Sequence, residues 1–318
     1  MSAELADRGD RPAARPGAAG ASEKSLTQRA LAGAPWAGGL LAVGLFGAAL
    51  LQLSQVSAEA LATVRRLSPA AWGVFALLCL AQPVADMVIF RRLWRLPLRG
   101  FAVMMRKTVI NEFLFGYTGE LYFYLWARRQ AGLSEAPFGA IKDVNILSAL
   151  GGNVLTLILL PISAVVVQKV SLVRELGPVL WPGLVVVALT FGLLLFRRRV
   201  FSLTRGELAY VAAVHGLRLL VVSGLTLLLW RLALPGVAFG VWLVLLTGRL
   251  LLARLPFVAN KDLMFANLVL LLFGAGSPTA LLLATLAIVT LLAHLAITAL
   301  VSAPRMLTAA RSEVQPGI

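Results

Sequence analysis

The feature that most constrains this chain is a series of apolar runs, each close to the length that crosses a bilayer. A helix needs about 20 predominantly apolar residues to span the hydrocarbon core. Only 14% of the residues are charged and 59% are hydrophobic, whereas a soluble domain carries about 25% charged residues. The sequence therefore predicts an all-α fold, a polytopic integral membrane helical bundle with about seven or eight spans. The main expected spans are 35–56, 69–90, 136–167, 180–196, 207–230, 237–258 and 279–302.

The formal charge of +15 is carried by arginines and lysines that cluster at the ends of the apolar runs. The positive-inside rule and anionic lipid surfaces place such clusters at cytoplasmic membrane ends. This placement argues against a nucleic-acid partner. The triplet Arg197, Arg198 and Arg199 is the clearest cytoplasmic marker. We expect a multi-pass protein of the cell inner membrane with a cytoplasmic N-terminus.

A single transmembrane domain is expected at 34–303, between two polar tails. Residues 1–33 are rich in Ala, Gly, Pro and mixed charge, which is typical of a disordered segment, here a cytoplasmic tail. Residues 304–318 form the second, short polar tail. The single cysteine, Cys79, lies inside an apolar run, so neither an internal disulfide nor a cysteine-based metal site is expected.

Two polar interruptions break the apolar pattern, near 111–129 and 256–275. Ionisable groups at membrane depth are costly and usually functional. Irregular backbone at that depth is tolerated only where protein or a wet cavity shields it. Two re-entrant segments are therefore predicted. They occupy matching places in an internal repeat, 69–167 and 237–302, whose parallel or inverted sense stays open.

Both interruptions supply candidates for a substrate-binding site. Glu112 and Glu120 could couple protons or hold a substrate amine, but they could equally neutralise basic residues in a shielded hairpin. Arg128 could contact a lipid phosphate or anchor at the interface. Lys142 could join a buried ion pair or belong to the polar start of a helix. The predicted substrate-binding set is Asn111, Glu112, Gly116, Gly119, Glu120, Arg128, Lys142, Asn145, Arg249, Asn260, Lys261 and Asp262.

Other polar residues inside the expected spans also have two interpretations. Asn145 and Asn153 could line a cavity or hydrogen-bond between helices. His294 could relay protons, although a packing histidine is the commoner case. His215 and His294 are too few and too widely separated to argue for a metal site. No hydrolase, metalloprotease or P-loop motif occurs in the sequence, so neither catalytic residues nor a cofactor is predicted.

The first interruption resembles the flippase-type membrane domain of lysylphosphatidylglycerol synthases and the stand-alone membrane proteins of that superfamily. Members tend to carry an Asn, then Pro-Gly-Arg-x-Gly-Glu, then an aromatic or basic helix and a charged start to the next span. The matching positions here are Asn111, Gly116, Gly119 and Glu120. The family's Pro and Arg are replaced by Phe115 and Tyr117. Because this Arg is replaced, the resemblance alone does not imply that the first interruption contacts a phosphate.

Members also carry a second loop, rich in Pro and Gly, near the C-terminal end. Leu255-Pro256-Phe257 stands where that loop would begin, but Asn260-Lys261-Asp262 replaces its glycines and downstream Glu. The resemblance extends over most of residues 36–302 and implies lipid transport. It does not imply lysyl transfer, because the chain carries no synthase domain.

These features predict a transporter or flippase-like protein that moves an amphipathic anionic substrate, a lipid or lipid-linked sugar, through a central polar cavity. Membrane lipids are the expected partners, together with a lipid-linked sugar, a homo-oligomer or a member of a biosynthetic complex. Two other classes stay open. One is a non-transporting scaffold subunit of a glycolipid or polysaccharide synthesis pathway, and the other is an intramembrane enzyme with Glu112 or Glu120 as base.

Overall fold

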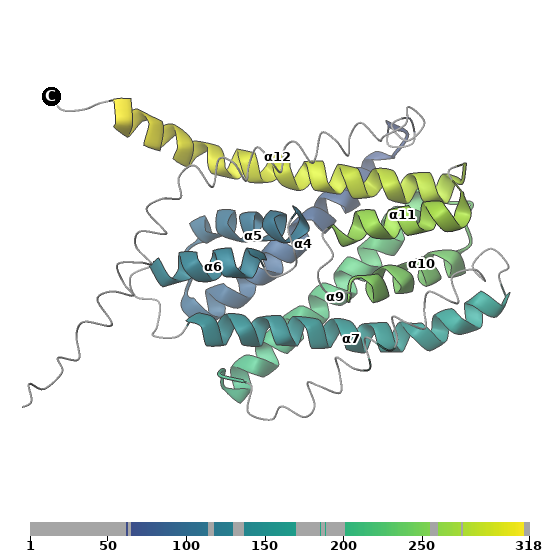
Figure 1. Cartoon of the computed structure of the whole chain (residues 1–318), viewed down its shortest axis with the longest axis horizontal. Coiled ribbons are helices and arrows are strands. Elements are labelled where there is room, and N and C mark those ends of the chain that lie inside the picture. Colours follow the sequence, from purple (N-terminus) through teal and green to yellow (C-terminus); the bar gives the residue numbers. More distant parts are fainter. Residues whose placement is uncertain are drawn as a thin grey trace, which may run out of the picture. The chain divides into compact units, whose positions relative to one another are not determined.

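A computed structural model gives the arrangement of the helices (Figure 1). The chain divides into two units, Met1–Leu51 and Gln52–Ile318, and only the second contains described residues. The structure describes residues 62, 65–113, 118–129, 137–169, 185, 188, 201–254, 260–274 and 276–314. The tail expected at 1–33 and the span expected at 35–56 lie outside these ranges, as does nearly all of the span expected at 180–196.

Within the described ranges the chain forms helices and no strand, which confirms the all-α prediction. The elements are α4 (Pro69–Trp94), the 3-10 turn η1 (Leu98–Gly100), α5 (Phe101–Phe113), α6 (Thr118–Arg129), α7 (Pro137–Lys169), α9 (Arg205–Ala233), α10 (Phe239–Leu252), α11 (Lys261–Phe273) and α12 (Pro278–Val314). Helix α12 therefore continues through most of the segment predicted as a polar tail.

Four of these helices, α4, α7, α9 and α12, are long and apolar enough to cross a membrane. They coincide with four of the predicted spans. The other four helices have only 12 to 14 residues, which corresponds to about 20 Å against a hydrocarbon core of about 30 Å. The span predicted at 237–258 is one of these short helices, because α10 ends at Leu252.

The helix lengths repeat along the chain in the order long, short, short, long. The first set is α4 to α7 and the second is α9 to α12. The second set therefore begins with α9, earlier than the predicted start at residue 237. In each set the two short helices lie between the long ones and fold back on each other, so we call α5–α6 and α10–α11 hairpin 1 and hairpin 2 (Figure 1).

The two sets run in opposite directions. At one end, the aromatic ring of Phe123 in α6 packs on Phe90 near the end of α4. At the same end, Asp143 at the start of α7 accepts a hydrogen bond from the backbone N–H of Leu203, just before α9. At the other end, the ring of Trp230 late in α9 packs on Trp242 early in α10. The two hairpins therefore enter from opposite ends and point toward each other.

Local sequence signals explain where several helices begin. Ser68 caps α4 by accepting from the backbone N–H of Ala71, and Pro69 occupies the first helical position, where no N–H is needed. A reciprocal capping box of Thr204 and Glu207 starts α9. Inside α4, Pro83 has no N–H to donate to the carbonyl four residues earlier. The carbonyl of Cys79 therefore lacks its helical donor.

The polar residues of α4 and α9 lie between two apolar clusters. One cluster contains Phe75, Cys79, Trp230 and Trp242, and the other contains Phe90, Phe123, Val144 and Val211. Gln82 and Asp86 separate the two clusters along α4, and His215 and Arg218 separate them along α9. Each long helix of this pair thus carries its polar side chains near its middle.

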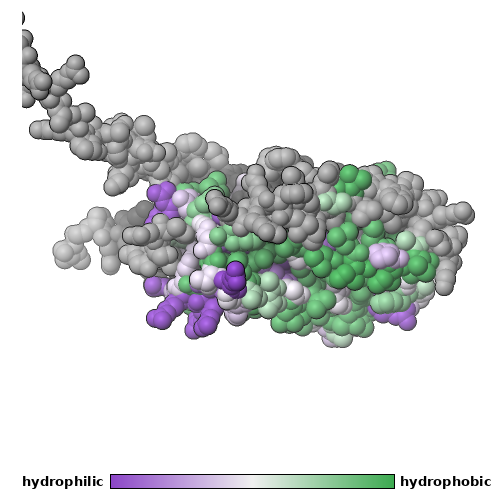
Figure 2. Space-filling model, turned by 90° about the horizontal axis from the view of Figure 1, so that it is seen from below, coloured by the Kyte–Doolittle hydropathy of each residue, from purple (hydrophilic) through white to green (hydrophobic). Residues whose placement is uncertain are grey.

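The outer surface is largely apolar. Figure 2 shows a face on which hydrophobic residues form a broad area and hydrophilic residues gather toward one end. Large apolar side chains of α7 and α9 are exposed, among them Val154, Ile158, Ile162, Leu217, Leu220 and Leu228. Exposed arginines collect where α4 and α6 end and α9 begins: Arg91, Arg92, Arg95, Arg128, Arg129 and Arg205. Fewer exposed arginines lie at the opposite end, among them Arg65, Arg66 and Arg231. An apolar exterior with more basic residues at one end is the distribution expected in a bilayer.

Candidate functional site

The two hairpins meet at their tips. The backbone N–H of Asn260, just before α11, donates to the carbonyl of Glu112 in α5 at 3.0 Å. Asn260 has a φ of 42°, a left-handed conformation that Asn tolerates better than most residues. Its side chain accepts from the backbone N–H of Leu263 and so caps α11. The two polar interruptions predicted from the sequence are thus in direct contact.

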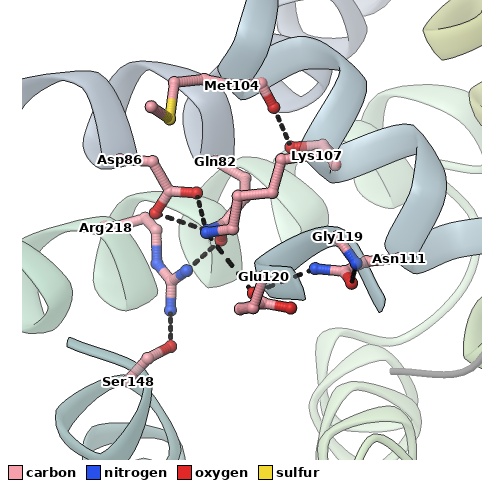
Figure 3. A network of polar contacts seen from close by, with 10 residues as sticks. Gln82, Asp86, Met104, Lys107, Asn111, Gly119, Glu120, Ser148 and Arg218 are labelled. Carbon is pink, nitrogen blue, oxygen red and sulfur yellow. Dashed lines mark hydrogen bonds and ion pairs between the residues drawn. The ribbon is translucent and has the colours of Figure 1, made fainter. Parts of the chain in front are cut away.

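Lys107 is the centre of an ion-pair network inside the first set of helices (Figure 3). Its ammonium lies 2.8 Å from a carboxylate oxygen of Asp86 in α4 and 3.4 Å from one of Glu120 in α6. The side chain of Lys107 is 5% exposed and that of Asp86 is 2% exposed. A buried cation shared by two carboxylates costs much less than an unpaired one, so the network stabilises α4, α5 and α6 against one another.

The side chain of Asn111 joins the two helices of hairpin 1. Its oxygen accepts from the backbone N–H of Gly119 at 2.8 Å, and its amide donates to Glu120 at 3.1 Å. A Cβ on Gly119 would lie 2.2 Å from the carbonyl oxygen of Lys107. Glycine is therefore required at this position by the close approach of α5 and α6. Gly116 lies outside the described residues.

Arg218 links α9 to α4 and α7 through neutral partners. Its guanidinium donates to the side-chain oxygen of Gln82 and, at 3.1 Å, to the hydroxyl of Ser148 (Figure 3). Asp86 contributes a nearby charge but accepts its hydrogen bonds from Gln82 and Lys107. Arg218 is therefore a partly buried cation that neutral side chains hold in place.

Hairpin 2 carries a second ion pair. Arg249 of α10 donates two parallel hydrogen bonds to the carboxylate of Asp262 in α11, at 2.8 and 2.7 Å. The ammonium of Lys261 donates to the carbonyl of Ala253 at 2.6 Å. These contacts close hairpin 2 near its tip, as the Asn111 contacts close hairpin 1.

His294 of α12 is bonded through both ring nitrogens. Its Nδ1 lies 2.8 Å from a carboxylate oxygen of Glu112, and its Nε2 lies 2.9 Å from the carbonyl oxygen of Cys79 in α4. The side chain of His294 is 7% exposed and that of Glu112 is 29% exposed. His294 therefore joins α12 to hairpin 1 and to α4 at the same point.

Two adjoining cavities surround these groups. The polar cavity, of about 310 Å³, is lined by Gln82, Asp86, Lys107, Thr108, Asn111, Glu120, Asn145, Ser148, Ala149, His215, Arg218, Ala253, Arg254 and Lys261. The mixed cavity, of about 320 Å³, is lined mainly by apolar side chains, with Glu112, Arg249, Asp262 and His294 at its hairpin side. Gln82, Thr108 and Arg218 line both cavities, so these three residues form the boundary between them.

Most of the predicted site residues come together at these cavities. Those that line one of the two are Asn111, Glu112, Glu120, Asn145, Arg249, Lys261 and Asp262. Gly119 and Asn260 lie beside them and shape the hairpin tips. Arg128 is exposed at the basic end, with its guanidinium 5.6 Å from the ring centroid of Tyr124. Lys142 is also away from both cavities, next to Asp143 and Ser202.

Several residues at the cavities were not among the predicted set. In the sequence, Lys107 stands beside Arg106 and resembles the basic residues at the ends of apolar runs. In the structure it is buried, as are its neighbours in α5 from Ala102 to Met105 and the following Thr108 and Val109. Gln82, Asp86 and Arg218 lie in the middle of apolar spans, and that position was the available signal.

His215 has an unusual environment. It is 1% exposed and lines the polar cavity. Neither ring nitrogen makes a hydrogen bond of ordinary geometry within the described residues, although the backbone of Val144 lies nearby. One carboxylate oxygen of Glu120, Oε2, is also buried, and it has no hydrogen-bond partner in the part of the chain that the structure describes, although Glu120 lines the same cavity. Buried polar atoms of this kind call for a partner, such as water or a ligand.

Comparisons with known proteins give no relative. No protein-family model, no curated protein and no solved structure matches the chain. Among the described residues, no group of three or more His, Cys, Asp or Glu side chains is arranged to hold a metal ion. Evidence on function therefore comes from the two cavities and the hairpins that close them.

Proposed function

We propose that this protein is a transporter or flippase-like protein that moves an amphipathic anionic substrate, a lipid or a lipid-linked sugar, across the membrane. The observation that carries the proposal is the pairing of a polar cavity with a largely apolar one across a shared boundary of Gln82, Thr108 and Arg218. A headgroup would occupy the polar cavity and an apolar chain the other. Volumes of about 310 and 320 Å³ lie at the lower end of the 300–1,000 Å³ usual for ligand sites.

The charge of the polar cavity favours an anionic headgroup. Four basic side chains and two acidic ones line it, an excess of two positive charges: Lys107, Arg218, Arg254 and Lys261 against Asp86 and Glu120. Among the described residues, Arg218 donates to the neutral side chains of Gln82 and Ser148, so its charge remains available to a phosphate. A planar guanidinium suits phosphate oxygens because it can donate two parallel hydrogen bonds.

The arrangement of the helices supports transport. In this proposal α4, α7, α9 and α12 cross the bilayer, and the two hairpins re-enter from opposite sides and meet near its middle. Inverted repeats with broken helices at a central site are a recurrent design of transporters. The exposed arginines around Arg128 mark the cytoplasmic side of the inner membrane. The predicted count of seven or eight spans includes α10 and the stretches 35–56 and 180–196.

We also propose that the resemblance to the flippase-type family extends to the second loop. Asn260 stands where family members carry glycine, and it has the positive φ of 42° that glycine adopts most easily. The arginine that the family has at position 117 is replaced by Tyr117. We propose that Lys107 and Arg218 supply the positive charge from other helices.

A specific observation favours the alternative of a non-transporting scaffold. Two of the central cations are closed in ion pairs, Lys107 with Asp86 and Arg249 with Asp262. A scaffold needs such charges only to hold its helices together. Transport by the purified protein alone therefore decides between the two functions.

The test is lipid translocation in proteoliposomes, measured by quenching of a fluorescent anionic lipid from one side. We expect translocation above that of empty vesicles, and at least a tenfold slower rate for Arg218→Gln. Arg205→Gln is the matched control, because it makes the same change on the same helix at an exposed position. Translocation equal to that of empty vesicles would favour the scaffold. A rate for Arg218→Gln equal to that of the wild type would contradict the proposed headgroup site.

A further inference from the structure

The number of hydrogens shared by Glu112 and His294 follows from the groups that the two ring nitrogens of His294 contact. The carbonyl oxygen of Cys79 can only accept, so Nε2 of His294 must carry a hydrogen to make its 2.9 Å contact. The remaining contact, between Nδ1 and Glu112 at 2.8 Å, needs one more hydrogen. Either the imidazole is charged and the carboxylate accepts, or the carboxylic acid donates to a neutral ring. Both arrangements hold the same number of protons.

Removal of one proton leaves one of the two contacts without a hydrogen. A neutral imidazole has a single N–H and can donate to Glu112 or to Cys79, but not to both. The Cys79 carbonyl depends on this donor, because its helical partner four residues later is Pro83, which has no N–H. An unsatisfied carbonyl in a buried position is costly, and Cys79 is 2% exposed.

Glu112, in contrast, has an alternative partner. Its side chain is 29% exposed and lines the mixed cavity, so water can solvate the carboxylate. The N–H therefore stays with Cys79 when the proton leaves. The lone pair of Nδ1 then faces the carboxylate of Glu112, and the contact between hairpin 1 and α12 is lost.

We propose that Glu112 and His294 form a binding site for one coupling proton, which holds the tip of hairpin 1 to α12 when bound and releases it when it leaves. The coupling role of this proton rests on the proposed transport function, whereas the binding of the proton by Glu112 and His294 does not. The proton passes between the pair and the water of the mixed cavity, and no other group changes its bonding. The backbone carbonyl of Glu112 also accepts from the backbone N–H of Asn260 in hairpin 2. Release of hairpin 1 from α12 would therefore loosen the contact between the two hairpins.

Charged groups from the surrounding helices face the same cavity. They are Arg218 of α9, Arg249 of α10 and Asp262 of α11. Arg249 and Asp262 are bonded to each other through two hydrogen bonds, so their charges largely cancel. Arg218 is held by Gln82 and Ser148. None of these three makes a hydrogen bond with Glu112 or His294 among the contacts that the structure describes.

Distance measurement by pulsed electron spin resonance can test the proton site. Spin labels at Leu121→Cys in hairpin 1 and Leu300→Cys in α12 lie on exposed positions. Cys79→Ser removes the only native cysteine and keeps the backbone carbonyl that His294 contacts. In lipid nanodiscs, we expect a single short distance at pH 5 and a growing population of longer distances as the pH rises to 11.

Two variants of the pair give opposite results if the proposal is correct. Glu112→Gln places an amide N–H against Nδ1, so it imitates the proton-bound pair, and the short distance should persist at every pH. His294→Phe removes both contacts, and the long population should be present at every pH. A distance that does not change with pH in the wild type would overturn the proposal. A pH response that survives unchanged in Glu112→Gln would also overturn it.

The same preparations separate this inference from the proposed function. A pH-dependent distance without lipid translocation in proteoliposomes would support the proton site and refute transport. Translocation with a distance that is the same at all pH values would refute the proton site and leave transport intact. Translocation that is fastest under an imposed pH gradient, and is insensitive to that gradient in Glu112→Gln, would support both.

Discussion

The backbone N–H of Asn260 lies 3.0 Å from the carbonyl oxygen of Glu112, and this hydrogen bond joins the two hairpins at their tips. Each hairpin is built from helices too short to cross a membrane, and each enters from a different end of the fold. The polar side chains that the hairpins carry are therefore collected in one place. Without the second repeat, Glu112 would lose two partners, the backbone N–H of Asn260 and the ring of His294.

Loss of the Lys107 ammonium should strongly destabilise the fold. Lys107→Met leaves two carboxylates, Asp86 and Glu120, buried without a cation. Breaking a buried ion pair on one side costs about 3–5 kcal/mol, and thermal unfolding in detergent measures this loss. Arg99→Met, at an exposed position, should have little effect.

A second substitution should restore part of that stability. Lys107→Met combined with Asp86→Asn and Glu120→Gln removes the unpaired charges together with the cation. We expect the triple variant to recover at least half of the loss, because neutral amides are far less costly to bury than unpaired carboxylates. A triple variant no more stable than Lys107→Met would show that the network does not act through charge pairing.

A methyl group at position 119 should force the arms of hairpin 1 apart. In Gly119→Ala the new Cβ would meet the carbonyl oxygen of Lys107 at 2.2 Å, and such overpacking costs about 1–3 kcal/mol. Gly73→Ala in α4 is the matched control, since nothing lies within 4 Å of its Cβ position. The control should be neutral or stabilising by up to about 1 kcal/mol. Equal unfolding temperatures for the two variants would contradict the close packing of α5 and α6.

The fork geometry of Arg249 should matter more than its charge. A double-mutant cycle with Arg249→Ala and Asp262→Ala should give a coupling energy of about 1 kcal/mol, because both side chains are partly exposed and solvent screens the pair. Arg249→Lys keeps the charge but cannot make the two parallel hydrogen bonds. We expect it to retain less than half of the coupling. A lysine variant with the full coupling energy would point to charge alone.

His215 should be more important for ligand binding than for stability. It is buried and lacks ordinary hydrogen bonds within the described residues, so His215→Leu should cost less than about 1 kcal/mol or even stabilise the apo protein. The same variant should lose most of the thermal stabilisation that anionic lipid gives to the wild type. His215→Gln should keep part of it, because an amide can still bond a ligand. A full thermal response to lipid in His215→Leu would exclude His215 from the headgroup site.

Much of the architecture could be predicted from the sequence because it depends on hydropathy and length. Four long apolar runs form α4, α7, α9 and α12, and both polar interruptions contribute residues to the two hairpins. Both interruptions supply candidates for one substrate-binding site, and the structure brings them into contact. The contact itself is a backbone hydrogen bond from Asn260 to Glu112, which pairs no charges.

The partners of individual charges could not be predicted in the same way. Lys107 follows Arg106 in the sequence, and both are basic residues with the same neighbours. Lys107 is nevertheless buried, at 4% exposure, whereas Arg106 is not. Only the direction in which each side chain leaves the helix separates them. Likewise, the pairing of Glu112 with His294 joins residues 182 positions apart, and no local pattern carries that information.

The order in which the chain is synthesised gives these pairings a further meaning. Lys107, Asp86 and Glu120 all belong to the first repeat, so their charges can be compensated before the second repeat leaves the ribosome. The partners of Glu112 are synthesised later, because Asn260 and His294 belong to the last helices. A half-made protein would thus hold a hydrated carboxylate at the tip of hairpin 1. Burial of that carboxylate would mark the moment at which the two halves of the nascent chain assemble.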